Sequence, residues 1–254
     1  MDIIQRMQIA PPFGYREVIP FLKTQKVRLL EAGEVPQFAR QANAIPISHT
    51  EFQLVARDYP IVFTTGDEGK NFAAIAVLGM VGGENLFFSD SGWAKGVYLP
   101  AYARRYPFCM ARVTVDSTEQ KDRLICIEKE YVDDQAGEAM FDAAGMPLAK
   151  WTGIEKLLSE YEADLERSRE LCSTLADYGV LEPFTMQATL NKGAGPIHLT
   201  GMHRVNEKNL EALNAAQLKN LIRKGHLARV YLHLLSLENF ARLLDRKAAR
   251  PAPG

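Results

Sequence analysis

A five-residue phrase that occurs twice constrains the fold of this chain more than any other feature. Residues 56–60 read ARDYP and residues 103–107 read ARRYP. Each copy is followed by an apolar run, a polar tip and a second apolar run. This order is typical of a β-hairpin, in which a polar turn joins two strands.

The agreement between the copies continues beyond the hairpins. Residues 83–87 read GENLF and residues 137–141 read GEAMF, and each segment is followed by an aspartate and then a glycine. The spacing differs most within the hairpin regions, where loop length is tolerant of change. We therefore expect an internal duplication in which residues 56–92 correspond to residues 103–145.

Two interpretations of the repeated phrase remain open. Proline fixes its own φ and biases the preceding tyrosine toward extended conformations, so that Tyr-Pro starts a strand and the tyrosine fills the core. Alternatively, the two copies pack about a pseudo-twofold axis and form an anion- or peptide-binding cluster. The strand-initiation interpretation is favoured, and the residues of the alternative are Arg57, Tyr59, Arg104, Arg105 and Tyr106.

The last third of the chain has helical periodicity. From Thr152 as N-cap, with Glu155 three residues later, apolar residues recur at helical spacing until Gly179 and Pro183. Residues 197–204 have the composition of one more strand. Three further helices are expected at 206–213, 215–223 and 227–246, the last a core helix whose polar side carries Arg229, His233 and Arg242.

These patterns predict an α+β protein. Two tandem β-hairpin modules form antiparallel sheet, and the C-terminal helices cover it. We expect residues 1–14 to form an N-terminal arm and residues 15–254 to form a single domain, with its helical part at 151–247.

Composition excludes several functional classes. Thirty basic residues against 31 acidic residues give a formal charge of −1, which does not favour nucleic-acid binding. Cys109, Cys126 and Cys172 are few and odd in number, so we expect no disulfide framework and a cytoplasmic location. No apolar run approaches the ~20 residues of a membrane helix, and no signal peptide is expected.

Several segments together resemble the bacterial SapC family. They are ARDYPIVF, GENLFF, YLPAYARRYPF, GVLEP and YLHLLSLENFARL, and the similarity extends from about Tyr15 to about Leu244. The family name implies an association with surface-layer proteins, and some members are labelled peptide-transport permeases. A permease needs membrane helices, which this sequence lacks. The resemblance implies one bacterial domain and carries no site residue across.

Metal and phosphate motifs are absent from the sequence. The five histidines form no H-x-x-x-H or H-E-x-x-H pattern, and there is no Cys-x-x-Cys. Residues 79–83, GMVGG, lack the lysine and hydroxyl of a phosphate-binding loop. We therefore expect no metal and no cofactor.

Candidates for nucleophilic and acid–base chemistry are few. Ser48 adjoins His49, but neighbours on an extended chain point to opposite faces. Cys109 lies in an apolar segment, where a small core residue is expected. Glu84 and Glu138 are related by the repeat and are a candidate carboxylate pair, although glutamates at such turns are usually solvated.

The sequence therefore predicts a non-enzymatic accessory or binding protein with a protein or peptide partner. Surface-layer or peptide-related processes are what the resemblance suggests. The alternative is an enzyme with a polar site between the two modules, for which Glu84, His49 and Arg104 are the candidates. A flat apolar surface favours the first hypothesis and a deep polar pocket favours the second. The sequence does not indicate the oligomeric state.

Overall fold

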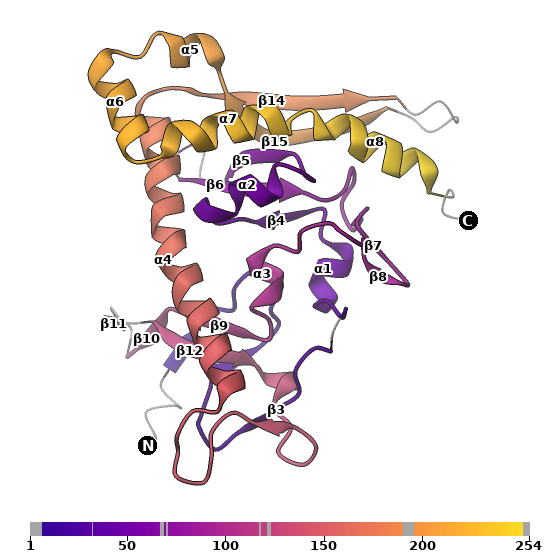
Figure 1. The fold of residues 1–254 in the computed structure, drawn as a ribbon, viewed down its shortest axis with the longest axis vertical. Coiled ribbons are helices and arrows are strands. Elements are labelled where there is room, and N and C mark those ends of the chain that lie inside the picture. Colours follow the sequence, from indigo (N-terminus) through magenta and orange to yellow (C-terminus); the bar gives the residue numbers. More distant parts are fainter. Residues whose placement is uncertain are drawn as a thin grey trace. The chain divides into compact units, whose positions relative to one another are not determined.

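The structure is a computed structural model with mixed helices and antiparallel sheets, which confirms the α+β class (Figure 1). It describes residues 7–31, 33–66, 69, 71–116, 118–120, 123–189 and 196–250.

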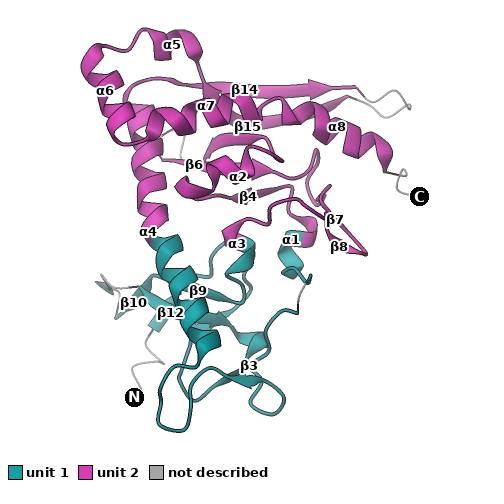
Figure 2. Cartoon of the chain, in the orientation of Figure 1, with its two compact units in different colours: residues 1–39, 103–162 teal, residues 40–102, 163–254 magenta. Residues whose placement is uncertain are grey.

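The chain divides into two compact units where the sequence predicted one domain (Figure 2). Unit 1 comprises residues 1–39 and 103–162, and unit 2 comprises residues 40–102 and 163–254. The two copies of the repeated segment belong to different units, because residues 56–92 lie in unit 2 and residues 103–145 lie in unit 1. Each copy therefore contributes to a sheet and a core of its own.

Unit 1 contains short strands in three small sheets. Their orders are β2-β12-β9, β1-β10-β11 and β13-β3. The strands are β1 (Met7–Ile9), β2 (Val18–Pro20), β3 (Lys26–Val27), β9 (Phe108–Ala111), β10 (Val113–Val115), β11 (Thr118–Glu119), β12 (Leu124–Glu128) and β13 (Glu138–Ala139). Met7–Ile9 fall within the expected N-terminal arm, yet they pair with Val113–Val115.

Aromatic side chains form much of the core of unit 1. The rings of Phe21, Phe108 and Trp151 lie within 5.5 Å of one another, and Tyr106 packs between Tyr15 and Tyr131. Large aromatic side chains bury much apolar area, which stabilises a sheet of short strands. The helical elements associated with this unit are η3 (Lys129–Tyr131), the start of α4 (Ala149–Asp177), and parts of α1 (Gln37–Gln41) and α3 (Ala101–Arg104).

Unit 2 is built on a five-stranded antiparallel sheet of order β14-β15-β5-β6-β4. Its strands are β4 (Ala44–Pro46), β5 (Ile61–Thr65), β6 (Phe72–Val77), β14 (Leu181–Ala188) and β15 (Ile197–Val205), and a separate small pair is β7 (Phe88–Ser89) with β8 (Gly92–Trp93). β5 and β6 are rich in β-branched and aromatic residues and form the hairpin expected after ARDYP.

Helices complete unit 2. They are η2 (His49–Glu51), α2 (Phe52–Val55), the end of α4, α5 (Glu207–Glu211), α6 (Ala215–Arg223), α7 (His226–Ser236) and α8 (Asn239–Ala249). α7 and α8 run along β14 and β15 (Figure 1), and the ring of His233 on α7 lies 5.0 Å from Phe63 on β5.

Three local predictions for the C-terminal part need correction. α4 begins at Ala149, so Thr152 lies inside the helix rather than at its N-cap. The expected helical part is interrupted by β14, whose residues mostly alternate between exposed and half-buried. The expected helix 227–246 is two helices, which meet at Leu237 and Glu238.

The repeated phrase initiates a strand in both copies, as predicted. Pro60 directly precedes β5 and Pro107 directly precedes β9. Tyr59 and Tyr106 are both buried. The first copy of the phrase follows the short helix α2, whereas the second copy begins inside the short helix α3. The internal duplication itself stays a prediction.

Candidate functional site

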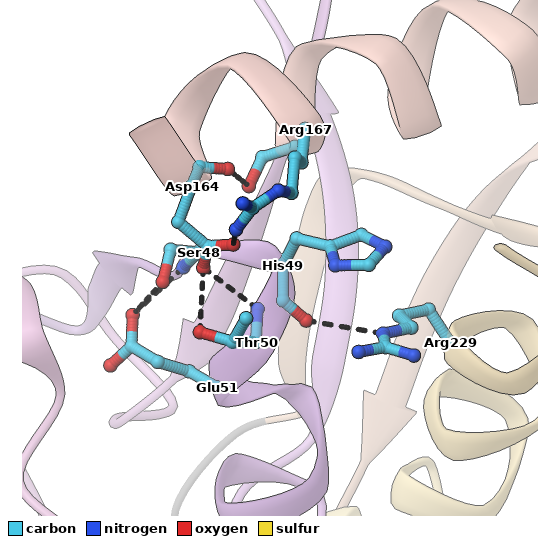
Figure 3. Close-up of polar contacts among 8 residues, drawn as sticks. Ser48, His49, Thr50, Glu51, Asp164, Arg167 and Arg229 are labelled. Atoms are coloured by element: carbon cyan, nitrogen blue, oxygen red, sulfur yellow. Dashed lines mark hydrogen bonds and ion pairs between the residues drawn. The ribbon is translucent and has the colours of Figure 1, made fainter. Parts of the chain in front are cut away.

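The most polar buried region of unit 2 is a corner around the one-turn helix η2 (Figure 3). Ser48 precedes this turn, and its N–H and hydroxyl both donate to Glu51 Oε2, at 2.9 and 2.7 Å. Glu51 Oε1 accepts from the Tyr98 hydroxyl at 2.9 Å and from the Ala101 N–H at 2.6 Å. The buried Glu51 carboxylate thus joins two segments of the chain, residues 48–51 and residues 98–101.

Asp164 on α4 holds the same turn from the other side. Its Oδ2 accepts from the N–H and the hydroxyl of Thr50, at 2.7 and 2.8 Å, and its Oδ1 lies 3.3 Å from Arg167. Burial raises the pKa of Asp164, but hydrogen bonds, chiefly those from the N–H and hydroxyl of Thr50, outweigh it and lower the pKa below the usual value. The carboxylate is therefore ionised and serves as an acceptor for the turn.

The His49 imidazole takes part in neither hydrogen-bond group. Its ring points away from Ser48 and Glu51 (Figure 3) and packs edge-to-face against His226, with 5.6 Å between ring centroids. Among the described residues, none hydrogen-bonds to a ring nitrogen of either histidine. Burial, with Arg229 nearby, lowers the pKa of His49 to about 4, so that the ring is neutral.

This geometry does not assemble a nucleophile and base from Ser48 and His49. A serine nucleophile needs its hydroxyl bonded to the base, and a third group must orient the base. Here the Ser48 hydroxyl donates to Glu51, and Asp164 accepts from Thr50. The corner therefore acts as a structural junction.

A second group of buried polar side chains on α7 and α8 was missed by sequence reasoning. His233 Nδ1 lies 2.8 Å from the Ile61 carbonyl, and its Nε2 accepts from the Val205 N–H at 3.1 Å. Ser236 Oγ accepts from the Ile61 N–H at 2.9 Å. Asn239 donates to the carbonyls of Ala56 and Tyr59. These side chains fix the start of β5. The regular spacing of three residues between His233, Ser236 and Asn239 is the sequence signal that could have predicted them.

The arginines and tyrosines of the repeated phrase are placed differently from one another. Arg57 and Arg104 are exposed, whereas Arg105 is buried in unit 1 beside Glu162, at 3.7 Å, and over the Tyr161 ring. Tyr59 donates to the Tyr98 carbonyl at 2.5 Å and accepts from Trp93. Both phrase tyrosines therefore serve as core residues.

The two repeat-related glutamates each have a lysine partner within their own unit. Glu84 is mostly buried; it pairs with Lys247 and accepts from the Met80 N–H at 3.1 Å. Glu138 is exposed and pairs with Lys150. Each carboxylate thus forms an ion pair within its own unit, and Glu84 also stabilises the loop that contains Met80.

The described residues show no metal site, and the buried cysteine Cys109 does not have the properties of a nucleophile. In the part of the chain that the structure describes, no group of three or more His, Cys, Asp or Glu side chains is arranged to hold a metal ion. Burial raises the pKa of the Cys109 thiol to about 12, which disfavours the nucleophilic thiolate. Within the same described residues, no helix is both long and apolar enough to cross a membrane.

The most unusual exposed feature of unit 2 is apolar. Leu218 and Ile222 on α6 are 37% and 58% exposed, and Tyr231 and Leu235 on α7 are 53% and 66% exposed. Residues four apart on a helix are neighbours on one face, and α6 and α7 contact one another. Leu218 with Ile222 and Tyr231 with Leu235 thus form two exposed apolar pairs, which together we call the α6–α7 surface.

This surface corrects the expected orientation of α7. The sequence predicted a core helix whose polar side carries His233, but His233 is fully buried and apolar residues are exposed instead. The polar atoms of His233 bind buried backbone groups, so hydropathy alone assigned the wrong face.

Comparison with known proteins identifies one family. The family model described as SapC matches residues 25–243, which is most of the chain, and the chain belongs to this family. Neither the curated proteins nor the solved structures gave a significant match.

Proposed function

We propose that this SapC-family chain is a non-enzymatic binding protein whose α6–α7 surface docks a different protein. The observation that carries the proposal is the exposure of Leu218, Ile222, Tyr231 and Leu235 on two consecutive helices. Large apolar side chains grouped on a protein surface are typical of protein-interaction sites.

The helices that carry this surface are held firmly. On α6, Asn214 and Gln217 form a capping box, Leu221 is fully buried, and Asn220 donates to the Tyr178 hydroxyl at 2.8 Å. Lys224, which follows α6, pairs with Glu170 of α4 at 2.6 Å. A partner therefore meets a preformed surface, which lowers the entropic cost of binding.

Docking buries apolar side-chain area, which stabilises a complex. Covering a large apolar side chain stabilises a complex by roughly 1–2 kcal/mol when half of it is already buried. Tyrosine is also enriched among residues that dominate interface energies, and Tyr231 lies at the centre of α7 in sequence. We place this interaction in the cytoplasm, as the scarcity of cysteine suggests.

Quantitative co-purification tests the proposal. The tagged full chain is expressed in its native cell as wild type, Ile222→Asp and Leu235→Asp. With each variant we expect the recovery of a partner bound at this surface to fall about ten-fold, because docking would bury the new carboxylate without a counter-charge. The matched control is Met146→Asp, which changes an equally exposed apolar residue of unit 1.

Two results would contradict the proposal. The first is that every co-purified protein behaves alike in all three variants, so that none is lost specifically with Ile222→Asp and Leu235→Asp. The other is recovery of a second copy of this chain as the only variant-sensitive species, which would assign the surface to self-association.

A further inference from the structure

The side chains of His49 and His226 form a buried pair of imidazole rings in unit 2. They are 6% and 1% exposed, and the rings pack edge to face with 5.6 Å between their centroids. Among the described residues, none hydrogen-bonds to any of the four ring nitrogens. Buried polar groups are nearly always hydrogen-bonded, because an unpaired one destabilises the fold. Four unpaired nitrogens at one contact therefore point to a role other than packing.

The two rings connect elements that are far apart in the chain. His49 begins η2, and His226 begins α7, directly after the turn at Gly225 that joins α7 to α6. Arg229, also on α7, donates to the His49 carbonyl at 3.3 Å (Figure 3) and to the Gly225 carbonyl at 3.4 Å. We call the two rings the histidine pair. The histidine pair thus holds the start of α7, and with it the turn to α6, against η2.

Positive charges surround the histidine pair. Arg229 of α7 and Arg167 of α4 face His49, and Lys224 and Arg229 face His226. His226 also lies at the N-terminus of α7, where the helix dipole is positive. A proton on either ring would add a charge to this group, and a second proton would place two positive rings side by side.

Two carboxylates of α4 face the histidine pair, but both already have partners. Asp164, near His49, accepts two hydrogen bonds from η2, at 2.7 and 2.8 Å, and Glu170, near His226, pairs with Lys224 at 2.6 Å. These carboxylates favour protonated rings, whereas burial opposes protonation and outweighs them. Burial lowers the pKa of His49 to about 4 and also lowers the pKa of His226. Both rings are therefore neutral at pH 7.

We propose that the histidine pair is a proton-sensitive contact, which releases the start of α7 from η2 when its rings are protonated. The buried contact accommodates neutral rings, whereas an open form lets water solvate charged ones. Release frees the turn between α6 and α7, the two helices of the α6–α7 surface. The inference concerns this conformational change alone and does not depend on a partner for that surface.

The sign and the size of the effect follow from the pKa values. A solvated histidine has a pKa of about 6.5, which is above the pKa of either ring in the closed form. Below pH 6.5 the open form therefore binds more protons than the closed form, and falling pH favours opening. Release of His49 alone raises the ratio of open to closed form about ten-fold between pH 7.5 and pH 5.5, and release of His226 adds to this rise.

Amide hydrogen exchange of the full chain measures the opening. Exchange rates are recorded by NMR at pH 7.5 and pH 5.5 and are divided by the intrinsic rates. The amides of residues 230–232 donate to the carbonyls of residues 226–228 at the start of α7. We expect their corrected exchange rates to rise at least about ten-fold at pH 5.5.

Matched variants assign the effect to the histidine pair. The double variant His49→Phe and His226→Phe keeps two aromatic rings but removes the nitrogens. Its rise at residues 230–232 should be smaller than that of the wild type by about ten-fold or more. His233 is present in every chain, so its own titration contributes equally. His198→Phe, at an exposed histidine of β15, should leave the wild-type rise unchanged.

A second measurement needs no variant. The ring-carbon signals of His49 and His226 in the wild type are followed by NMR as the pH is lowered, and a pKa below 6.5 is expected for both rings. Three results would overturn the proposal. They are a wild-type rise in exchange below about two-fold, an equal rise in the double variant, or a pKa at or above 6.5 for either ring.

Discussion

Replacing Glu51 by alanine is expected to destabilise the protein strongly, although Glu51 lies in a helix of only one turn. Glu51 is only 4% exposed, and its carboxylate accepts from Ser48, Tyr98 and Ala101. These donors belong to two segments that are distant in the sequence, so the truncation removes the acceptor that joins them.

The magnitude follows from the donors that cannot find another partner. The N–H groups of Ser48 and Ala101 are fixed in the backbone, and both residues are buried. Each buried donor left unsatisfied costs about 1–3 kcal/mol. The hydroxyls of Ser48 and Tyr98 can rotate toward other acceptors, so we count only the two N–H groups and expect a loss of about 4 kcal/mol.

Urea denaturation at neutral pH measures this loss as a change in the free energy of unfolding. Glu51→Gln keeps the size of the side chain and one acceptor oxygen, but its amide NH₂ faces groups that are themselves donors. We therefore expect a smaller loss, of about 2 kcal/mol. The matched control is Glu155→Ala, which truncates an exposed glutamate of α4 and should change stability by less than about 0.5 kcal/mol.

A loss below about 1 kcal/mol for Glu51→Ala, similar to Glu155→Ala, would refute this reasoning. It would mean that water or a rearranged turn satisfies the Ser48 and Ala101 donors, and that the corner is not a structural junction.

Two further predictions concern buried rings. Tyr59→Ala and Tyr106→Ala are each expected to cost about 3–5 kcal/mol, seen as early melting in calorimetry, and unchanged melting in both variants would refute the strand-initiation role. Burial lowers the pKa of His233 from 6.5 to about 4 in the folded protein. Between these two pH values the unfolded state binds more protons than the folded state, so the free energy of unfolding decreases as the pH falls through this window. His233→Phe should cost about 2–4 kcal/mol at pH 7 because Val205 and Ile61 lose their partner. The His226 ring has no described hydrogen bond, so His226→Phe should cost under about 1 kcal/mol at pH 7 and should lessen the loss of stability at acid pH, both measured by urea denaturation. Equal destabilisation by His233→Phe and His226→Phe would contradict this prediction.

Local signals in the sequence predicted some elements well. α6 occupies Ala215–Arg223 as expected, because Asn214 and Gln217 cap it through contacts three residues apart. The strands that follow the repeated phrase begin where proline requires. Such elements depend on neighbours along the chain, which the sequence displays directly.

Other features depend on residues far apart and could not be predicted. His233 binds Ile61, 172 residues away, and Asp164 binds Thr50, 114 residues away. The exposure of Tyr231 and Leu235 results from how α7 packs on the sheet, and hydropathy cannot distinguish a buried apolar side chain from an exposed one.

Site-specific photo-cross-linking in the native cell tests the binding role most directly. A benzophenone amino acid replaces Tyr231 in the full chain, and a matched chain carries it at Met146, which is also exposed. The account predicts a defined adduct with another protein from position 231 that Leu235→Asp abolishes and that position 146 does not give. Identical adducts from both positions, or adducts unaffected by Leu235→Asp, would contradict it.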